Sequence, residues 1–296
     1  MKNYSIRRYT LEDYAIWNNF VSSAKNATFL FHRDFMEYHS DRFQDFSLLV
    51  FDEDNLISIL PANRVDDSLF SHQGLTYGGF VFDSKIKLGE VISVTKAVLA
   101  FLHSAEITTF QIKLIPSIYN AFFSEEIEYV MFLANAKLIR KDCLSVIDLT
   151  KPFEITKTRK ESIRRGEKNS LEIREELKFD LFWNEILIPN LNKKHVTKPV
   201  HSLTEINDLQ QKFPKNIRHF NVYHEDKIVA GTITSSPFLS FPSWIYPLKI
   251  KTKASKPLPT PMQWLEPQYS AKLFSNILTS SPRINQPLSK TNFIFC

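Results

Sequence analysis

The character of the chain changes at Thr234, and this change limits which part of it can fold around a core. From Ser235 to Cys296 there is no glycine, and the segment holds nine of the 15 prolines, ten serines and one acidic residue, Glu266. Proline removes a backbone donor and interrupts helices and sheets. The segment shows neither the helical nor the strand period of apolar residues. This composition is typical of translation in a wrong reading frame, and a disordered basic tail is the alternative. We expect an irregular Ser/Pro-rich tail over residues 235–296.

The net charge of +5 belongs to this tail rather than to the rest of the chain. Seven of the 37 Lys and Arg residues and one of the 32 Asp and Glu residues follow Thr234, so the tail carries +6 and residues 1–234 carry −1. A basic surface is the usual signature of nucleic-acid binding. Because the excess is confined to the tail, we expect no DNA partner.

Cysteine usage and the lengths of apolar runs favour a reducing, cytoplasmic setting. Two cysteines, Cys143 and Cys296, make no disulfide framework and no metal-ligand cluster. No apolar run follows the charged N-terminal residues, which predicts no signal peptide. No apolar stretch is long enough to span a membrane, so we expect no integral membrane segment.

Residues 1–150 alternate between strand and helix periodicity, with turn residues between them. The expected order is a strand (6–9), two helices (10–21 and 34–39), three antiparallel strands (47–51, 56–60 and 68–72), a helix (88–102), a strand (108–114), a helix (125–134) and a long strand (138–149). This mixture predicts an α/β protein with a mixed α+β sheet.

The same pattern begins again after residue 150 and stops at the tail. The expected elements are a basic helix (157–168), a strand (171–174), a helix (179–191), a helix opened by the capping box Ser202–Glu205, and a hairpin (217–223 and 227–234). The chain therefore divides into a first module (1–150), a partial second module (151–234) and the tail (235–296).

Several motifs in residues 1–234 occur in a recognisable order. They are Trp17–Val21, Thr28–Arg33, Tyr38–Arg42, Leu60–Asn63, Ser71–Gly79, Ile115–Tyr119, Ser124–Glu126 and Lys194–His201. Together they resemble the FemAB-like acyltransferases of the GNAT (acyl-CoA N-acyltransferase) superfamily, a branch often met among envelope-polysaccharide genes. The resemblance implies tandem GNAT-like modules, the second incomplete, so that the chain is a truncated member.

The resemblance also implies an activity in cell envelope biogenesis. An acyl or aminoacyl group would pass to an amino group of a cell-envelope saccharide or a peptidoglycan precursor. The implied donor is acyl-CoA or an aminoacyl-tRNA, with no metal, and tRNA would then be a partner. The implied acceptor is a small-molecule or lipid-linked saccharide.

The segment Ser71–Gly79 is the first candidate site, because it places polar side chains between three glycines. Glycine lets the backbone approach a ligand closely. A Gly-rich turn between two strands is the structural alternative. With the resemblance, the segment predicts an acceptor-binding loop in which His72, Gln73 and Tyr77 contact the ligand.

A second group follows an expected strand end and leads into a helix. Lys113, Tyr119 and Tyr129 are predicted acceptor contacts, since the fold implied by the resemblance carries ligand contacts at such positions. Glu126, beside Glu125, is a candidate catalytic residue that could accept the proton of an amine. The alternative is that the two carboxylates stabilise the helix N-terminus through its dipole.

The basic helix is the third candidate, because its cations recur every three or four residues and form one stripe. Such a stripe could bind the phosphates of a nucleotide sugar, a lipid-linked precursor or a tRNA; a solvated face with Glu161 and Glu167 interleaved is the alternative. The stripe consists of Lys157, Lys160, Arg164 and Lys168, and the predicted phosphate contacts are Arg164, Arg165, Lys168 and Lys198.

His195 and His201 are further catalytic candidates, because imidazole exchanges protons near neutral pH. Without a third ligand they make no zinc site, and a purely structural loop is the alternative.

The sequence contains no Gln/Arg-x-x-Gly-x-Gly/Ala segment of the kind that cradles the pyrophosphate of coenzyme A at a helix N-terminus. A non-catalytic module that binds a saccharide or nucleotide sugar is therefore the alternative to an enzyme.

Overall fold

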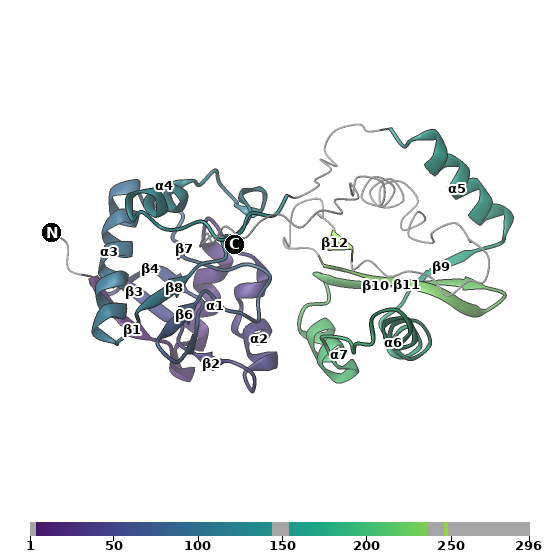
Figure 1. The fold of residues 1–296 in the computed structure, drawn as a ribbon, viewed down its shortest axis with the longest axis horizontal. Helices are drawn as coiled ribbons and strands as arrows, with labels where there is room; N and C mark the ends of the chain where they lie inside the picture. Colours follow the sequence, from purple (N-terminus) through teal and green to yellow (C-terminus); the bar gives the residue numbers. More distant parts are fainter. Residues whose placement is uncertain (1–3, 144–153, 236–245, 248–296) are drawn as a thin grey trace. The chain divides into compact units, whose positions relative to one another are not determined.

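The computed structural model describes residues 4–143, 154–235 and 246–247. These residues form two compact units, one of residues 4–143 and one of residues 154–235 with 246–247 (Figure 1). Apart from Ser235 and residues 246–247, the expected irregular tail lies outside the described residues. Within the described ranges, no helix is both long enough and apolar enough to cross a membrane.

The first unit mixes short helices with two small sheets. Its helices and helical turns are η1 (Leu11–Asp13), α1 (Tyr14–Ser23), η2 (Phe29–Phe31), α2 (Arg33–Met36), η3 (Glu37–His39), α3 (Leu88–Ser104), η4 (Ser117–Tyr119) and α4 (Glu126–Leu133). Its strands are β1 (Tyr4–Arg8), β2 (Gln44–Asp45), β3 (Leu48–Asp52), β4 (Asn55–Leu60), β5 (Asn63–Val65), β6 (Ser68–Phe70), β7 (Val81–Phe82) and β8 (Thr109–Gln111).

The strands form two sheets rather than the single sheet that the sequence predicted. The first has the antiparallel order β1-β3-β4-β7, and the second has the order β2-β5-β6-β8, in which β6 and β8 run parallel. The third expected antiparallel strand, β6, therefore does not join β3 and β4: it lies in the second sheet, where it pairs antiparallel with β5. Pro61 ends β4, and β6 pairs with β5 through a tight turn at Asp66, whose φ is 53°.

The core of the first unit lies under α3. Val91, Val94, Val98 and Leu102 recur at helical spacing and are buried against the apolar side chains of both sheets and of α4. Burial of each such side chain contributes roughly 1.5–3 kcal/mol. This packing fixes α4, which carries Glu126 and Tyr129, and β8, whose continuation carries Lys113.

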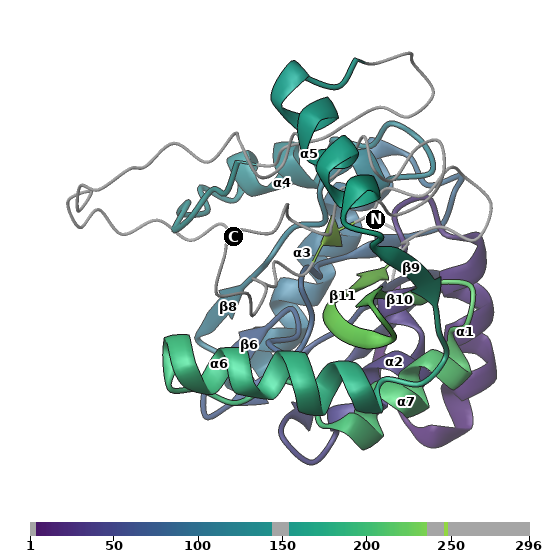
Figure 2. The same cartoon turned by 90° about the vertical axis from the view of Figure 1, so that its right-hand side faces the viewer.

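The second unit is an antiparallel sheet with helices packed on it. Its elements are α5 (Lys157–Lys168), β9 (Glu172–Glu175), the π-helical turn η5 (Phe182–Leu187), α6 (Ile188–His195), α7 (Leu203–Lys212), β10 (Ile217–His224), β11 (Lys227–Ser235) and β12 (Tyr246–Pro247). The strand order is β12-β11-β10-β9. Both α6 and α7 lie on one side of this sheet (Figures 1 and 2).

The two units share a local order. In each, a strand is followed by helices and then by an antiparallel hairpin: β1, β3 and β4 in the first unit, and β9, β10 and β11 in the second. The first strand pairs with the near strand of the hairpin in both, and each hairpin carries a register shift near its turn.

Two expected elements differ from the sequence prediction. The helix expected over 179–191 is a π-helical turn that continues as α6 to His195 and stops at Val196, which has a left-handed φ of 49°. The strand expected over 138–149 was wrong for residues 138–143, which form no regular element, and residues 144–149 lie outside the described ranges.

Candidate functional site

The loop Ser71–Gly79 is tied at both ends to the segment that continues β8. The backbone N–H of Ser71 donates to the Gln111 carbonyl (2.9 Å), and the N–H of Gly78 donates to the Lys113 carbonyl (2.6 Å). Lys113 also donates from its backbone N–H to Ser71 Oγ (2.8 Å) and from Nζ to the Leu75 carbonyl. Lys113, a predicted acceptor contact, thus stabilises the loop.

Two of the predicted contacts in this loop point into the protein. His72 is 3% exposed and its ring stacks on that of His39, with 5.3 Å between centroids. Burial, together with the neighbouring His39 ring, lowers the pKa of His72 to about 3, so the ring is neutral at pH 7. Tyr77 is buried too, and its hydroxyl donates to Thr28 Oγ1 (3.0 Å).

Gln73, the third predicted contact of the loop, is exposed but held in place. Its backbone N–H donates to Asn63 Oδ1 (2.7 Å), and its side-chain Oε1 accepts from Asn63 Nδ2 (2.9 Å). Asn63 is fully buried on β5. In the sequence Asn63 is recognisable only as part of the motif Leu60–Asn63, because no local pattern reveals a pairing across ten residues.

Glu126 and Tyr129 line an open pocket of about 380 Å³ at the start of α4. The pocket is lined by Leu88, Phe123, Ser124, Glu125, Glu126 and Tyr129. Glu126 and Tyr129 are three residues apart, so one helical turn brings them to the same face. Phe123 is fully exposed at its rim and Tyr129 is half-exposed. The pocket thus combines carboxylates with aromatic surface.

The carboxylate of Glu126 is held by two donors. Lys25 Nζ lies 2.5 Å from Oε1, and Ser124 Oγ donates to Oε2 (2.7 Å). Burial alone would raise the pKa of Glu126, but the hydrogen bonds from Lys25 and Ser124 outweigh it and lower the pKa below its usual value. Glu126 is therefore ionised at neutral pH. Lys25 was missed by the sequence analysis.

Tyr119, another predicted acceptor contact, does not line this pocket. Its side chain is buried, and its ring centroid is 5.5 Å from that of Tyr77. The Tyr77 ring also contacts that of Phe31, with 5.9 Å between centroids. Of the predicted acceptor contacts, Tyr129 therefore lies at the pocket with the catalytic candidate Glu126, whereas His72, Gln73 and Lys113 lie at the loop.

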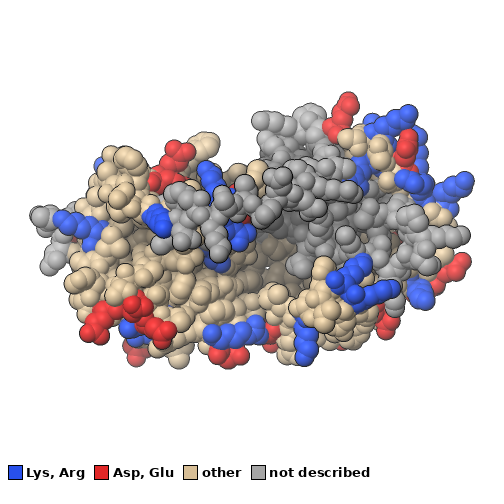
Figure 3. Space-filling model, viewed as in Figure 1, with Lys and Arg blue, Asp and Glu red and all other residues tan. Residues whose placement is uncertain are grey.

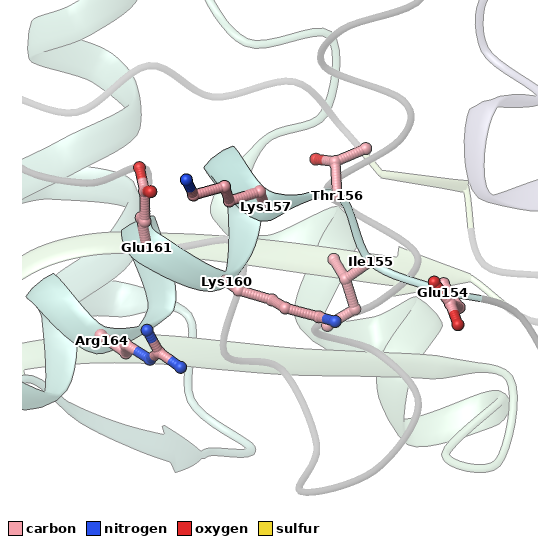
Figure 4. A pocket seen from close by; sticks show the side chains of 7 residues that line it. All are labelled: Glu154, Ile155, Thr156, Lys157, Lys160, Glu161 and Arg164. Carbon is pink, nitrogen blue, oxygen red and sulfur yellow. The ribbon is translucent and has the colours of Figure 1, made fainter.

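In the second unit, the basic stripe of α5 borders a pocket of about 450 Å³. Its lining consists of Glu154, Ile155, Thr156, Lys157, Lys160, Glu161 and Arg164 (Figure 4). Lys and Arg side chains gather along α5 on the molecular surface (Figure 3). Among the described residues, none forms an ion pair with Lys157, Lys160 or Arg164.

The remaining predicted phosphate contacts and the two histidines do not line this pocket. Arg165 donates to Ser162 Oγ (3.4 Å), and Lys168 ends α5. His195 is the exposed last residue of α6, and Lys198 and His201 follow in the connection to α7. Within the described parts of the chain, no three His, Cys, Asp or Glu side chains are grouped so that they could hold a metal ion.

Comparisons with known proteins give distant structural likenesses. No protein-family model and no curated protein matches the sequence. The chain is similar to the crystal structure of FemX, at 12% identity and a TM-score of 0.42, over 74% of this chain and 57% of the FemX chain. A second similar structure has 11% identity and a TM-score of 0.38. It is described as a GCN5-related glucosamine N-acetyltransferase region of a fungal multi-domain GH3 β-N-acetylglucosaminidase.

That second likeness covers 81% of this chain and 29% of the other. The chain thus spans little more than half of FemX and less than a third of the fungal protein. At these TM-scores, the likenesses carry no argument about residues or activity.

Proposed function

We propose that this chain is an N-acyltransferase of the FemAB-like type, which transfers an acyl or aminoacyl group to an amino group of a cell-envelope saccharide or peptidoglycan precursor. One observation carries the proposal: the pocket at the start of α4 combines an ionised carboxylate, Glu126, with the aromatic side chains of Phe123 and Tyr129. A saccharide amine is protonated in water at neutral pH. A site that binds an amino sugar therefore needs an anionic partner for the ammonium and an aromatic surface for the sugar ring.

Glu126 has the properties that the acceptor amine requires. An amine attacks a carbonyl only as the free base, so a proton acceptor beside it is needed. The Glu126 carboxylate holds the ammonium and accepts its proton; because its lowered pKa makes it a weak base, its larger contribution is to bind and orient the amine. An aromatic face favours a nearby cation by about 0.5–2 kcal/mol. The nitrogen lone pair then forms the new C–N bond, and the thiolate of CoA, or the ribose oxygen of tRNA, leaves and is protonated.

The α5 pocket supplies a second part of the proposal. Three cations without carboxylate partners among the described residues suit the phosphates of a nucleotide-linked or lipid-linked saccharide. We further propose that the second unit is a partial second GNAT-like module, supported by the strand, helix and hairpin order that it shares with the first. Because acyl-CoA and aminoacyl-tRNA are cytoplasmic donors, the reaction would be a cytoplasmic step.

A non-catalytic saccharide-binding module is the second candidate function. The absence of a Gln/Arg-x-x-Gly-x-Gly/Ala segment from the whole sequence favours it, since this is the segment that would bind the donor pyrophosphate. In such a protein the acceptor pocket is kept and the transfer chemistry is lost.

One experiment separates the two functions. The full chain is titrated with D-glucosamine, N-acetylglucosamine and UDP-glucosamine by calorimetry, and then supplied with acetyl-CoA or an aminoacyl-tRNA. We expect the free amines to bind and N-acetylglucosamine not to bind. Binding with donor turnover supports the transferase, and binding without turnover supports the module. Failure of both amines to bind eliminates both, and a Glu126→Gln variant with unchanged affinity removes this pocket from the proposal.

A further inference from the structure

Lys25 connects three separate parts of the first unit. It lies between α1 and η2, and its backbone N–H donates to the Phe82 carbonyl at the end of β7 (3.0 Å). Its own carbonyl accepts from the N–H of Ala121 (2.8 Å), in the segment that leads to the pocket. Its side chain reaches Glu126 on α4. The backbone of Lys25 is thus fixed before its side chain makes any contact.

The ion pair between Lys25 and Glu126 is asymmetric in exposure. The Lys25 side chain is 5% exposed and the Glu126 side chain is 23% exposed, and only Glu126 belongs to the pocket lining. Lys25 therefore approaches the carboxylate from the interior, while Ser124 Oγ holds the second oxygen. The exposed side of the carboxylate is left facing the pocket.

Stability alone gives little reason to keep this buried cation. Removing an ammonium group from water is unfavourable, and an apolar side chain of similar volume often replaces a buried ion pair without loss of stability. The exposed partner carboxylate gains less from the pair than a buried one would. A buried lysine aimed at a pocket carboxylate has a clearer role in fixing that carboxylate.

We propose that Lys25 is a positioning residue for the acceptor pocket, which holds the Glu126 carboxylate in one orientation at the pocket wall. This inference rests on the proposed function, in which Glu126 receives the acceptor amine. Nearby carboxylates add to the need for this cation, because Glu125 and Glu128 lie within two residues of Glu126 in the chain and like charges favour protonation. Without a cation behind it, Glu126 would share this tendency to take up a proton.

The test follows the Glu126 carboxyl directly in the full chain. The protein is labelled with ¹³C-glutamate and titrated by NMR, and the Glu126 signal is assigned by its loss in Glu126→Gln. We expect Lys25→Met to raise the pKa of Glu126, and Lys25→Arg to restore it toward the wild-type value. Lys96→Met, an exposed lysine on α3, is the matched control and should leave the titration unchanged.

Binding gives a second, independent readout. In Lys25→Met, the affinity for D-glucosamine should fall about tenfold or more, as expected when a hydrogen bond to a charged group loses its orientation. Lys25→Arg should recover most of it. If Lys25→Met does not fold, Ser124→Ala removes the other donor and should shift the pKa of Glu126 in the same direction.

The outcomes are distinct from those that decide the proposed function. A pKa of Glu126 that is the same in wild type and Lys25→Met overturns the positioning role, whether or not any saccharide binds. If the pKa moves but wild-type protein binds no amine, the proposed function fails and the role of Lys25 as an acceptor-site residue fails with it. A shift that Lys25→Arg does not restore also contradicts the inference.

Discussion

Arg33 should be the side chain on which the first unit depends most for its stability. Its side chain is 4% exposed, and Nε donates to Glu37 Oε1 (3.0 Å) while the other nitrogens donate to Asp45 and to Ser47 Oγ (3.3 Å). The guanidinium carbon also lies 3.6 Å from the centre of the Tyr9 ring. Three segments therefore meet at one cation: residues 33–37, residues 45–47 and Tyr9, directly after β1.

The expected cost of Arg33→Met follows from these contacts. Breaking a fully buried ion pair destabilises a protein by about 3–5 kcal/mol. The two carboxylates here are about one-third exposed and can regain water, so we reduce the estimate to about 2–4 kcal/mol. For a unit of this size, that loss lowers Tm by about 6–16 °C. Arg33→Lys should recover only part of it, because lysine lacks the planar fork.

Hydrogen exchange measured by mass spectrometry resolves the effect in the full chain. Opening free energies should fall in peptides from β1, α1 and β3 and stay constant in peptides from β10 and β11. Arg42→Met is the control, because Arg42 is exposed and lies 3.9 Å from an exposed Asp41 carboxylate, a pair that contributes about 0–1 kcal/mol. An Arg33→Met protein as stable as wild type would refute the reasoning and show that apolar packing replaces the network.

Three further predictions test other parts of the structure. First, the first unit should lose stability as pH falls from about 6.5 to about 3. Throughout this window His72 is protonated in the unfolded state and neutral in the folded state. Each pH unit therefore lowers the free energy of unfolding by up to about 1.4 kcal/mol. Urea titrations at pH 7, 5 and 4 should show this dependence weakened in His72→Phe. Second, Gly231→Ala should destabilise the second unit by about 1–3 kcal/mol, because the added Cβ would lie 2.5 Å from the Phe182 ring and 2.6 Å from Asn221 Oδ1. In Gly89→Ala, on α3, the added Cβ would meet no atom within 4 Å. That substitution should stabilise the first unit by about 0.5–1 kcal/mol. Thermal melts of the pair decide this, and equal effects would contradict it. Third, Lys160→Glu with Arg164→Glu should weaken calorimetric binding of pyrophosphate at least tenfold relative to Lys193→Glu, and unchanged binding would remove the α5 pocket as a phosphate site.

Elements with a local signal could be predicted well from the sequence. The expected bounds of α5 agree with the structure, and the capping box of Ser202 and Glu205 opens α7. The paired strands of both long hairpins were predicted from their period and their turn residues, and Glu53, Glu225 and Asp226 adopt the positive φ that tight hairpin turns need. The β5 and β7 strands were missed because two or three residues show no period, and the parallel pairing of β6 with β8 depends on distant parts of the chain.

In the candidate site, too, local relations between residues could be predicted from the sequence and long-range contacts could not. Glu126 and Tyr129 were predicted as members of one group that follows a strand end, and in the structure both line one pocket because residues three apart on a helix share a face. The partner of Glu126 could not be found in this way, since Lys25 lies 101 residues earlier in the chain. His72 and Tyr77 were predicted as ligand contacts because glycine lets a loop approach a ligand closely and because of the family resemblance, but the anchored loop turns both side chains inward. Whether either contacts a ligand stays a prediction.

The two buried cations of the first unit show why one is structural and the other belongs to a site. Arg33 is surrounded by two carboxylates, a hydroxyl and an aromatic ring, so its charge is fully used within the fold. Lys25 has a single carboxylate partner among the described residues, and the far side of that carboxylate opens to a pocket. The planar guanidinium of arginine can donate to several partners at once, as Arg33 does. The compact ammonium of lysine suits a single contact with one carboxylate, as in the pair of Lys25 and Glu126. Substitution should therefore separate them: Arg33 variants should change stability with little change in the Glu126 titration, and Lys25 variants should change that titration first.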